Sequence, residues 1–269
     1  MTVTIGITCY NRKSILEKMA SSLRRSRIPI NISIRVYDDC STEYGIDYLK
    51  VLFPDAKTII HNDKNYGPDW NTWTMYKDFL KSEDEYFFNA DSDILFDPSW
   101  LEFSLRNIEK TDGILSLFNT KTHVTLQNID EDLCIKKDLG AAGTFFKRIK
   151  VKELLGVIED GSKHIDWQWS DYFTSQGTRL FCSSRSFVQH IGILGYNSIG
   201  GFIDFGEKFV ICNVEDGQVI NDVFEKFIDT SKIACNEKVE KIKRSTTYRV
   251  GEFIIKPATI VRKLLKKGK

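Results

Sequence analysis

The sequence predicts an α/β fold with a mostly parallel central sheet flanked by helices and with a helical, basic C-terminal extension. Short apolar runs alternate with longer amphipathic stretches through the first half of the chain, as in repeated strand-helix-strand units. Hydrophobic residues make up 42% of the 269 residues, which is enough for a substantial core. The end of the chain differs from the rest because it is rich in lysine and arginine.

Strands and helices are expected to alternate up to residue 117. The apolar runs predict strands at 3–9, 32–37, 58–61, 85–89 and 113–117. The amphipathic stretches predict helices at 13–25, 44–53, 69–81 and 98–109. Spacings of three and four in the first helix predict a buried face made of Leu16, Met19, Ala20 and Leu23. In the fourth helix, Pro98 fits the first turn, after Asp97 as the cap.

The second half of the chain is less regular. Residues 119–146 have a mixed pattern that predicts hairpins or a loop region. Helices are expected at 150–155 and 166–176, and a last strand at 186–190. Because no internal repeat or low-complexity linker interrupts the chain, residues 1–204 are predicted to form one domain and residues 205–269 an extension.

Residues 241–269 form a strongly basic segment in a chain whose formal net charge is only +1. They contain ten Lys and Arg residues and one acidic residue, Glu252, for a local net charge of +9. Apolar residues interleave with these cations, as in an amphipathic segment that lies on an anionic membrane surface. A helix docked on the protein body and a nucleic-acid-binding arm are the alternatives. We expect the membrane surface, and no nucleic acid, as the partner.

The six cysteines are widely scattered and lack the short spacings of a structural zinc site. Two fall in or beside apolar runs, which suits reduced thiols in a cytosolic protein. The first eight residues lack the charged and apolar regions of a secretion signal, and no apolar run reaches the roughly 18 residues needed to span a bilayer. We therefore expect a cytoplasmic protein, either soluble or peripheral on the cytoplasmic face of the membrane.

An acidic motif, Asp91-Ser92-Asp93, follows directly after the apolar run that predicts the fourth strand. In an open α/β sheet, ligands bind at the carboxyl ends of the strands, so both carboxylates are expected to face a binding crevice. Two carboxylates one residue apart suit a hard divalent cation that takes its other ligands from phosphate and water. A turn or a helix cap is the alternative, because Asp and Ser are common in both.

Four short motifs lie in the first half of the chain. They are the run from Ile5 to Arg12, the Asp-Asp-Cys-Ser-Thr turn of residues 38–42, the Asn-Tyr-Gly turn of residues 65–67, and Asp91-Ser92-Asp93. In residue types, order and spacing, this set resembles the family 2 glycosyltransferases, enzymes that use nucleotide-sugar donors and have the fold called GT-A. The likeness extends from about residue 3 to residue 195. It implies a nucleotide-sugar-binding half at 1–118 and an acceptor half at 119–204.

The resemblance also implies roles for single residues. Thr8, Tyr10 and Arg12 would lie along the nucleotide, Asp39 would accept a hydrogen bond from its base, and Asp91 would contact the ribose or a metal ion. The implied donor-binding residues are Thr8, Tyr10, Arg12, Asp39, Asn65, Gly67, Asp91 and Ser92. At Asp39 ordinary turn chemistry is the alternative, and Cys40 replaces the glycine that the family has in this turn.

Two motifs of the second half resemble parts of the family's acceptor site. The small residues from Gly140 to Gly143 would let a sugar approach the backbone. The run from Ile165 to Asp171 resembles the family's Glu-Asp motif, with Ile165 in place of the Glu. The resemblance implies that Asp166, rather than Asp171, is the base that deprotonates the attacking hydroxyl of the acceptor. A helix N-cap is the alternative for Asp166. Trp167 and Trp169 follow closely, and we expect them to bind the acceptor sugar, with a place in the hydrophobic core as the alternative.

The expected metal ligands are Asp93, Asp91 and His190. In the family a histidine in a His-x-Gly setting can be the third protein ligand, and imidazole is an acceptable ligand for manganese. A structural histidine with satisfied hydrogen bonds is the alternative. The expected cofactor is Mn²⁺ or Mg²⁺, which would neutralise charge that develops on the departing diphosphate.

The function expected from the resemblance is an inverting, non-processive glycosyltransferase of the hexosyltransferase type in surface polysaccharide or glycoconjugate synthesis. It would move one sugar from a nucleotide-diphosphate sugar, with UDP as the expected carrier, to a glycan, lipid-linked or protein-linked acceptor. One alternative is a sugar-phosphate nucleotidyltransferase, which would need a glycine-rich basic loop that residues 8–13 do not supply. The other is a non-catalytic glycan-binding protein of the same fold.

Overall fold

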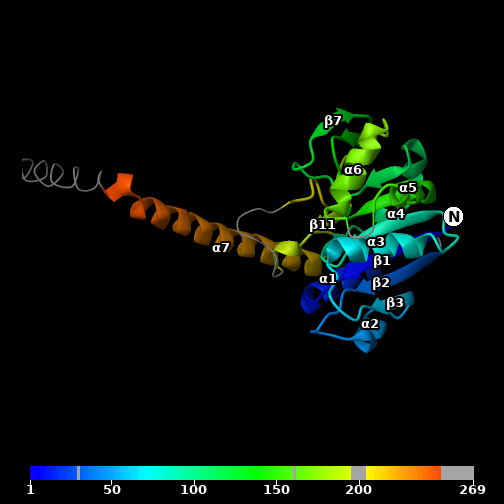
Figure 1. Ribbon diagram of the computed structural model, residues 1–269, viewed down its shortest axis with the longest axis horizontal. Helices are drawn as coiled ribbons and strands as arrows, with labels where there is room; N and C mark the ends of the chain where they lie inside the picture. Colours follow the sequence, from blue (N-terminus) through cyan, green and yellow to red (C-terminus); the bar gives the residue numbers. More distant parts are fainter. Residues whose placement is uncertain (29–30, 160–161, 195–203, 250–269) are drawn as a thin grey trace, which may run out of the picture. The chain divides into compact units, whose positions relative to one another are not determined.

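The computed structural model describes residues 1–28, 31–159, 162–194 and 204–249. Within these residues, nine strands form one sheet in the order β3-β2-β1-β4-β9-β6-β10-β8-β7, and β5 and β11 form a separate two-stranded sheet (Figure 1). In the large sheet β8 and β9 run against both of their neighbours, while the other strands share one direction. The predicted α/β fold with a mostly parallel sheet is therefore confirmed.

The bounds of the elements are as follows. The strands are β1 (Val3–Cys9), β2 (Ile32–Asp38), β3 (Ala56–His61), β4 (Tyr86–Asp91), β5 (Ile94–Phe96), β6 (Ile114–Ser116), β7 (Thr125–Asn128), β8 (Leu133–Lys136), β9 (Thr144–Lys147), β10 (Leu180–Ser183) and β11 (Val188–His190). The α-helices are α1 (Lys13–Arg24), α2 (Ile46–Leu52), α3 (Pro68–Phe79), α4 (Trp100–Asn107), α5 (Arg148–Leu155), α6 (Ile165–Ser175) and α7 (Val214–Arg244). Two short 3₁₀ helices are η1 (Ile108–Lys110) and η2 (Gly192–Leu194).

The predicted elements of the first half are present, with shifted ends. The predicted buried face of α1 is confirmed, since Leu16, Met19, Ala20 and Leu23 are each no more than 4% exposed. The predicted start of the fourth helix is wrong, because α4 begins at Trp100 and its N-cap is Ser99. The Asp97 carboxylate instead closes a turn by accepting a hydrogen bond from the Ser99 N–H at 2.8 Å, and it pairs with Arg185 at 2.8 Å.

The irregular second half contains the strands that turn the sheet antiparallel. Strands β7 and β8 form a hairpin, and β9 inserts between β4 and β6. The predicted last strand is shorter than expected, and as β11 it pairs with β5 and not with the large sheet. The sequence reading did not identify β5 and β10, which have only three and four residues.

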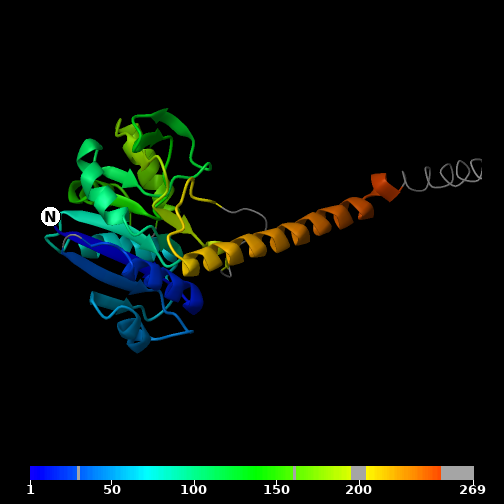
Figure 2. The ribbon, with the colours of Figure 1, turned by 180° about the vertical axis from the view of Figure 1, so that it is seen from behind.

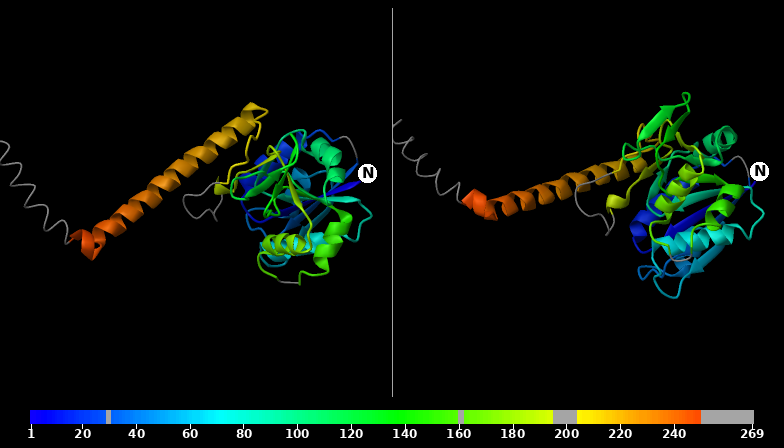
Figure 3. Two further views of the ribbon diagram at one scale, coloured as in Figure 1. Left: turned by 90° about the horizontal axis from the view of Figure 1, so that it is seen from above. Right: turned by 45° about the horizontal axis from the view of Figure 1, so that its top comes forward.

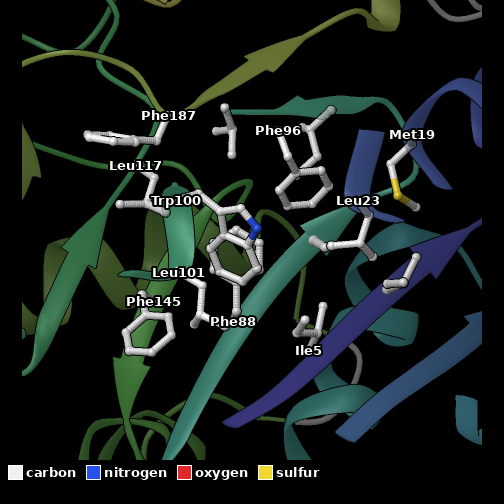
Figure 4. Packing of buried hydrophobic residues seen from close by; sticks show 14 of the residues in the cluster. Ile5, Met19, Leu23, Phe88, Phe96, Trp100, Leu101, Leu117, Phe145 and Phe187 are labelled. Atoms are coloured by element: carbon white, nitrogen blue, oxygen red, sulfur yellow. The ribbon is translucent and has the colours of Figure 1, made fainter. Parts of the chain in front are cut away.

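Helices cover both faces of the large sheet and enclose two cores. One cluster joins α1, α2 and α4 to the sheet, and the other joins α3, α5 and α6. Neighbouring residues of β4 point to opposite faces, so Phe88 belongs to the first core and Phe87 to the second. The view from behind places α1, in dark blue, in front of the sheet (Figure 2). In the first core the Trp100 ring lies 4.3 Å from the Phe88 ring (Figure 4).

The helix α7 confirms the predicted helical extension. Its first part packs on the α/β domain through three buried side chains, Val219, Ile220 and Val223. The Arg25 guanidinium also donates a hydrogen bond to the buried Asp216 carboxylate. Within α7, the boundary between two compact units of the chain lies between Val223 and Phe224. The domain boundary expected between residues 204 and 205 stays a prediction.

The basic segment is described only in part. Residues 250–269 of the predicted membrane-binding segment 241–269 lie outside the described residues. Within the described ranges, no helix combines the length and the hydropathy that crossing a bilayer requires. All six cysteines have free thiols, and three of them, Cys9, Cys134 and Cys182, are buried.

Candidate active site

The carboxyl ends of β1, β2 and β4 meet at one edge of the sheet. Near the end of β1, Thr8 is in register with Tyr37 of β2 on one side and with Asp91 of β4 on the other. The turns that follow these parallel strands therefore open on the same side of the sheet. A cavity of about 790 Å³ lies there, and it is also lined by Asp166 from α6.

Most of the predicted site residues line this cavity. Those that do are Thr8, Tyr10, Arg12, Asp39, Asn65, Asp91, Ser92, Asp93 and Asp166. Gly67 and His190 are not among the lining residues, but each contacts one of them: Gly67 contacts Asp39, and His190 contacts Asp93. Motifs that are far apart in the sequence are thus brought together by the sheet.

Asp39 is 3% exposed and holds the turn that follows β3. Its Oδ1 accepts hydrogen bonds from Asn62 Nδ2 at 3.0 Å and from the Tyr66 N–H at 2.9 Å. Its Oδ2 accepts one from the Gly67 N–H at 2.8 Å. Because a carboxylate oxygen can accept two hydrogen bonds, Oδ2 keeps one position for a ligand. The geometry is therefore compatible with a role in the turn and with a role in nucleotide binding.

Strained backbone conformations gather in the loops around the cavity. Four residues with side chains have positive φ angles there: 47° at Asn11, 57° at Arg12, 64° at Cys40 and 57° at His164. Such a conformation costs roughly 1–3 kcal/mol per residue unless it is glycine that adopts it. Cys40 thus adopts a left-handed backbone conformation that is unfavourable for cysteine. The same conformation would suit the glycine that the family has at this position of the turn.

Asp93 lies between two cationic side chains. Its Oδ2 accepts a hydrogen bond from Arg12 Nη1 at 2.7 Å, and its Oδ1 lies 3.3 Å from His190 Nε2. Burial acts to raise the pKa of Asp93, but the neighbouring His190 and Arg12 outweigh it and hold that pKa below its usual range. Burial acts in turn to lower the pKa of His190, yet the Asp93 carboxylate outweighs it and raises the pKa to about 9. In this state His190 is an imidazolium paired with Asp93.

The same residues fit a divalent cation by the chemistry of their donor atoms. Burial, followed by repulsion from Asp93, raises the pKa of Asp91, and a cation near both carboxylates would offset that repulsion. The backbone at Gly192 packs closely against both side chains of the Asp93–His190 pair, because a Cβ there would clash with His190 Cε1 and would lie 2.7 Å from Asp93 Oδ2. His190 would have to lose its proton to be a ligand. Within the described residues no three His, Cys, Asp or Glu side chains form a complete metal site, so other ligands would come from phosphate and water.

Asp166 is the second residue of α6, whose N-cap is His164, so the alternative role of Asp166 as an N-cap is wrong. Its Oδ1 accepts a hydrogen bond from the Trp167 N–H at 2.9 Å, while Asp69 accepts one from the Ile165 N–H at 3.0 Å. Burial, and then the negative charge of Asp69, raise the pKa of Asp166. A raised pKa suits a carboxylate that must take up a proton near neutral pH.

The two tryptophans that were expected to bind the acceptor point in different directions. Trp167 is 46% exposed, and its ring lies 6.0 Å from that of His123. Trp169 has no exposed surface, and its ring packs edge-on against Phe146 in the second core at 5.3 Å. Because a side chain in the core cannot touch a ligand, Trp169 is removed from the expected acceptor contacts and Trp167 is kept.

Several cavity residues were missed by the sequence reading. They include Asn11, Glu43, Asp69, Asn71, Thr72 and His164. Asp69, Asn71 and Thr72 lie in the first turns of α3, directly after the recognised Asn-Tyr-Gly turn, and that position was the available signal. His164 precedes α6 with a left-handed backbone, which no local pattern of the sequence predicts.

Comparisons with known proteins agree with this fold. The model of the family described as glycosyl transferase family 2 matches residues 4–132. No curated protein sequence matches the chain. Among solved structures, residues 1–349 of S. aureus TarS superpose with a TM-score of 0.53 at 16% identity, covering 72% of this chain and 61% of TarS 1–349. The chain thus spans less than two thirds of that fragment.

Two ligand complexes are similar to the same degree. S. aureus TarS 1–349 in complex with UDP-GlcNAc has a TM-score of 0.52 and 18% identity, covering 70% of this chain and 58% of that one. The mannosyltransferase PcManGT from Pyrobaculum calidifontis, in complex with GDP-Man and Mn²⁺, has a TM-score of 0.52 and 16% identity, covering 66% and 53%. At such identities the likeness establishes the fold.

Proposed function

We propose that the chain, whose residues 4–132 match the model of glycosyl transferase family 2 and whose fold is GT-A, transfers one sugar, with inversion, from a nucleotide-diphosphate sugar to an acceptor hydroxyl. The observation that supports this proposal is that one cavity is lined by Asp39, the Asp91-Ser92-Asp93 motif and Asp166. These residues match the family motifs for nucleotide, metal and base. A UDP-linked donor is proposed, as in the TarS complex with UDP-GlcNAc.

In the proposed reaction the donor lies along the turns that follow β1, β2 and β4. Thr8, Tyr10 and Arg12 contact the nucleotide, and Asp39 with the turn of residues 65–67 holds the base. A carbon–oxygen bond forms between the acceptor oxygen and the anomeric carbon, while the bond from that carbon to the diphosphate breaks. Asp166 takes the proton of the acceptor hydroxyl, so the products are a glycoside and a nucleoside diphosphate.

A divalent cation, Mn²⁺ or Mg²⁺, is proposed to be held by Asp93, Asp91 and His190, and it would neutralise charge on the departing diphosphate. The mannosyltransferase complex with Mn²⁺ supports this proposal. Arg12 now donates to Asp93 and Ser92, at 2.7 and 3.1 Å. With Asp93 as a ligand of the cation, the Arg12 guanidinium would be available to bind a phosphate oxygen of the donor.

The acceptor is proposed to be a glycan, a lipid-linked sugar or a glycosylated protein. Residues 241–269 are proposed to hold the enzyme at an anionic membrane surface, on the cytoplasmic side. The described part of this segment supports that proposal, because its cations alternate with exposed apolar side chains such as Ile242 and Tyr248.

Donor binding is tested by thermal unfolding with a panel of UDP, GDP, UDP-GlcNAc, UDP-glucose and GDP-mannose, each with and without Mn²⁺. We expect at least one nucleotide to stabilise the chain when Mn²⁺ is present, and a ligand at 100 times its Kd adds about 2.7 kcal/mol. The nucleotide sugar with the same nucleotide should also be hydrolysed slowly by water, which releases nucleoside diphosphate. If no nucleotide stabilises the chain with or without Mn²⁺, the proposed function is wrong.

The pH dependence of transfer should report the raised pKa of Asp166. The base must be deprotonated, so kcat/KM is expected to fall as the pH drops through that pKa, which lies above the usual aspartate range because of burial and then Asp69. In Asp69→Asn the like charge is removed while an oxygen remains to accept the Ile165 N–H. The acidic limb should therefore move to lower pH. The exposed Asp55→Asn is the control, and an equal shift in both variants would contradict the assignment.

A further inference from the structure

A histidine–carboxylate pair lies where the β7–β8 hairpin joins the domain, and it has no role in the reaction proposed above. His123 precedes β7 and Asp138 follows β8, so the two strands bring them together (Figure 3, in green). The Nδ1 atom of His123 lies 2.5 Å from Oδ1 of Asp138. His123 is only 8% exposed.

The position of this pair is fixed by contacts from buried polar groups. Lys136 is 3% exposed, and its Nζ donates to the carbonyl oxygens of Thr120 at 3.1 Å and of His123 at 2.9 Å. A buried ammonium group without hydrogen bonds is costly. Because these two contacts satisfy the ammonium group of Lys136, they hold the loop in place. On the other side, the Leu139 N–H donates to Ser170 Oγ at 3.1 Å, which ties the loop to the helix of Asp166.

The other ring nitrogen of His123 is directed toward the candidate base. A Cβ built on Gly140 would lie 3.7 Å from His123 Nε2 and 4.0 Å from Asp166 Oδ2. The two atoms are therefore separated by no more than the sum of these distances, and the missing side chain of Gly140 leaves the space between them open. Within the described part of the chain, Nε2 has no hydrogen-bond partner.

We propose that His123, oriented by Asp138, is an acceptor-binding residue whose Nε2 accepts a hydrogen bond from a second hydroxyl of the acceptor, beside the one that Asp166 deprotonates. This inference rests on the proposed sugar transfer. In the neutral imidazole, a hydrogen bond to the Asp138 carboxylate places the ring proton on Nδ1 and leaves the Nε2 lone pair facing the open space. The acceptor is thus a polyol or sugar with two neighbouring hydroxyls.

The geometry suits such a diol. The distance from His123 Nε2 to Asp166 Oδ2 is at most the sum given above. Two hydrogen bonds of about 2.8 Å, joined by the spacing between neighbouring hydroxyl oxygens, can span it. Trp167 completes the subsite, because its exposed ring lies 6.0 Å from the His123 ring and can cover the apolar face of a sugar. An acceptor with a single hydroxyl would leave Nε2 unpaired and should be a poorer substrate.

The tautomer and the contact can be tested without turnover. The full chain has four histidines, so ¹⁵N-histidine labelling gives few signals, and His123→Ala identifies the one of interest. We expect the proton of His123 on Nδ1. Its Nε2 signal should shift on addition of methyl glucoside, methyl galactoside or glycerol in excess, and not on addition of tetrahydropyran, a ring without hydroxyls. A proton on Nε2, or no shift with any polyol, overturns the proposal.

Kinetics separate an acceptor role from a structural one. In His123→Ala the KM for the acceptor should rise roughly 10-fold, the loss expected for one hydrogen bond to substrate. Hydrolysis of the donor by water and Mn²⁺-dependent UDP binding should stay as in the wild type. Lys137→Ala, an exposed residue of the same loop, is the matched control. An unchanged acceptor KM in His123→Ala refutes the role of His123. If the wild type itself binds no nucleotide, the proposed function is refuted.

Discussion

Asp166→Asn is expected to lower the rate of sugar transfer by about 100- to 10,000-fold, the usual effect of removing a general base. Asparagine keeps the shape and a hydrogen-bond-accepting oxygen for the Trp167 N–H, but it cannot take up the proton of the acceptor. The thermal stability of the variant and its affinity for UDP should change little, because asparagine is of similar size and keeps the hydrogen bond from the Trp167 N–H. Single-turnover assays with saturating donor measure the chemical step.

The control for this experiment lies on the same helix. Asp171 is exposed, and Asp171→Asn makes the same chemical change one and a half turns further along α6. We expect its transfer rate to equal that of the wild type. The assignment of the base fails if Asp166→Asn retains full activity, or if both variants lose activity to the same extent.

Asp93→Asn is expected to weaken Mn²⁺-dependent nucleotide binding by at least about 100-fold. Groups that only support a metal ligand typically contribute 10- to 100-fold to affinity, and a direct ligand should contribute no less. Titration calorimetry of UDP with and without Mn²⁺ measures the effect. Binding of UDP in the absence of metal should be retained, since the turn held by Asp39 is unchanged.

The same substitution removes the buried carboxylate that pairs with two partly exposed cations. Arg12 and His190 both face Asp93, so the free energy of unfolding should also fall, because each cation loses its paired carboxylate. Thermal unfolding without ligand separates this loss from the loss of metal binding. Asp55→Asn, an exposed carboxylate away from the cavity, is the control. Equal Mn²⁺ dependence in Asp93→Asn and the wild type would refute the metal proposal.

The parallel half of the fold was predictable because its central strands, β1 and β4, are buried on both faces. Such strands appear as continuous apolar runs, and the helices between them have a clear period. The short strands β5 and β10 give no such signal, since three or four residues are too few for a period. Their pairing depends on the rest of the fold, as does the switch of β9 to the antiparallel direction.

The site was predictable where its residues are part of a motif. Asp39, Asp91, Asp93 and Asp166 lie at strand ends or helix starts, and these positions in an α/β sheet converge. Residues brought in by tertiary structure, such as His123, lack a local pattern.

Trp169 shows how a site prediction fails when a helical period is overlooked. Ile165, Trp169 and Phe173 recur every four residues along α6 and are all buried, so Trp169 belongs to the core stripe. Trp167 lies on the other side of the helix, and the same spacing would have separated the two tryptophans from the sequence alone.

The arginine and the histidine beside Asp93 have a consequence for how the protein is made. In many small metalloproteins the ion must be present for the chain to fold, because nothing else neutralises its ligands. Here Arg12 and His190 supply positive charge from the chain itself. The proposed metal ion would therefore not be needed for folding. On this proposal, a cell short of manganese would accumulate folded protein that gains activity when the ion returns.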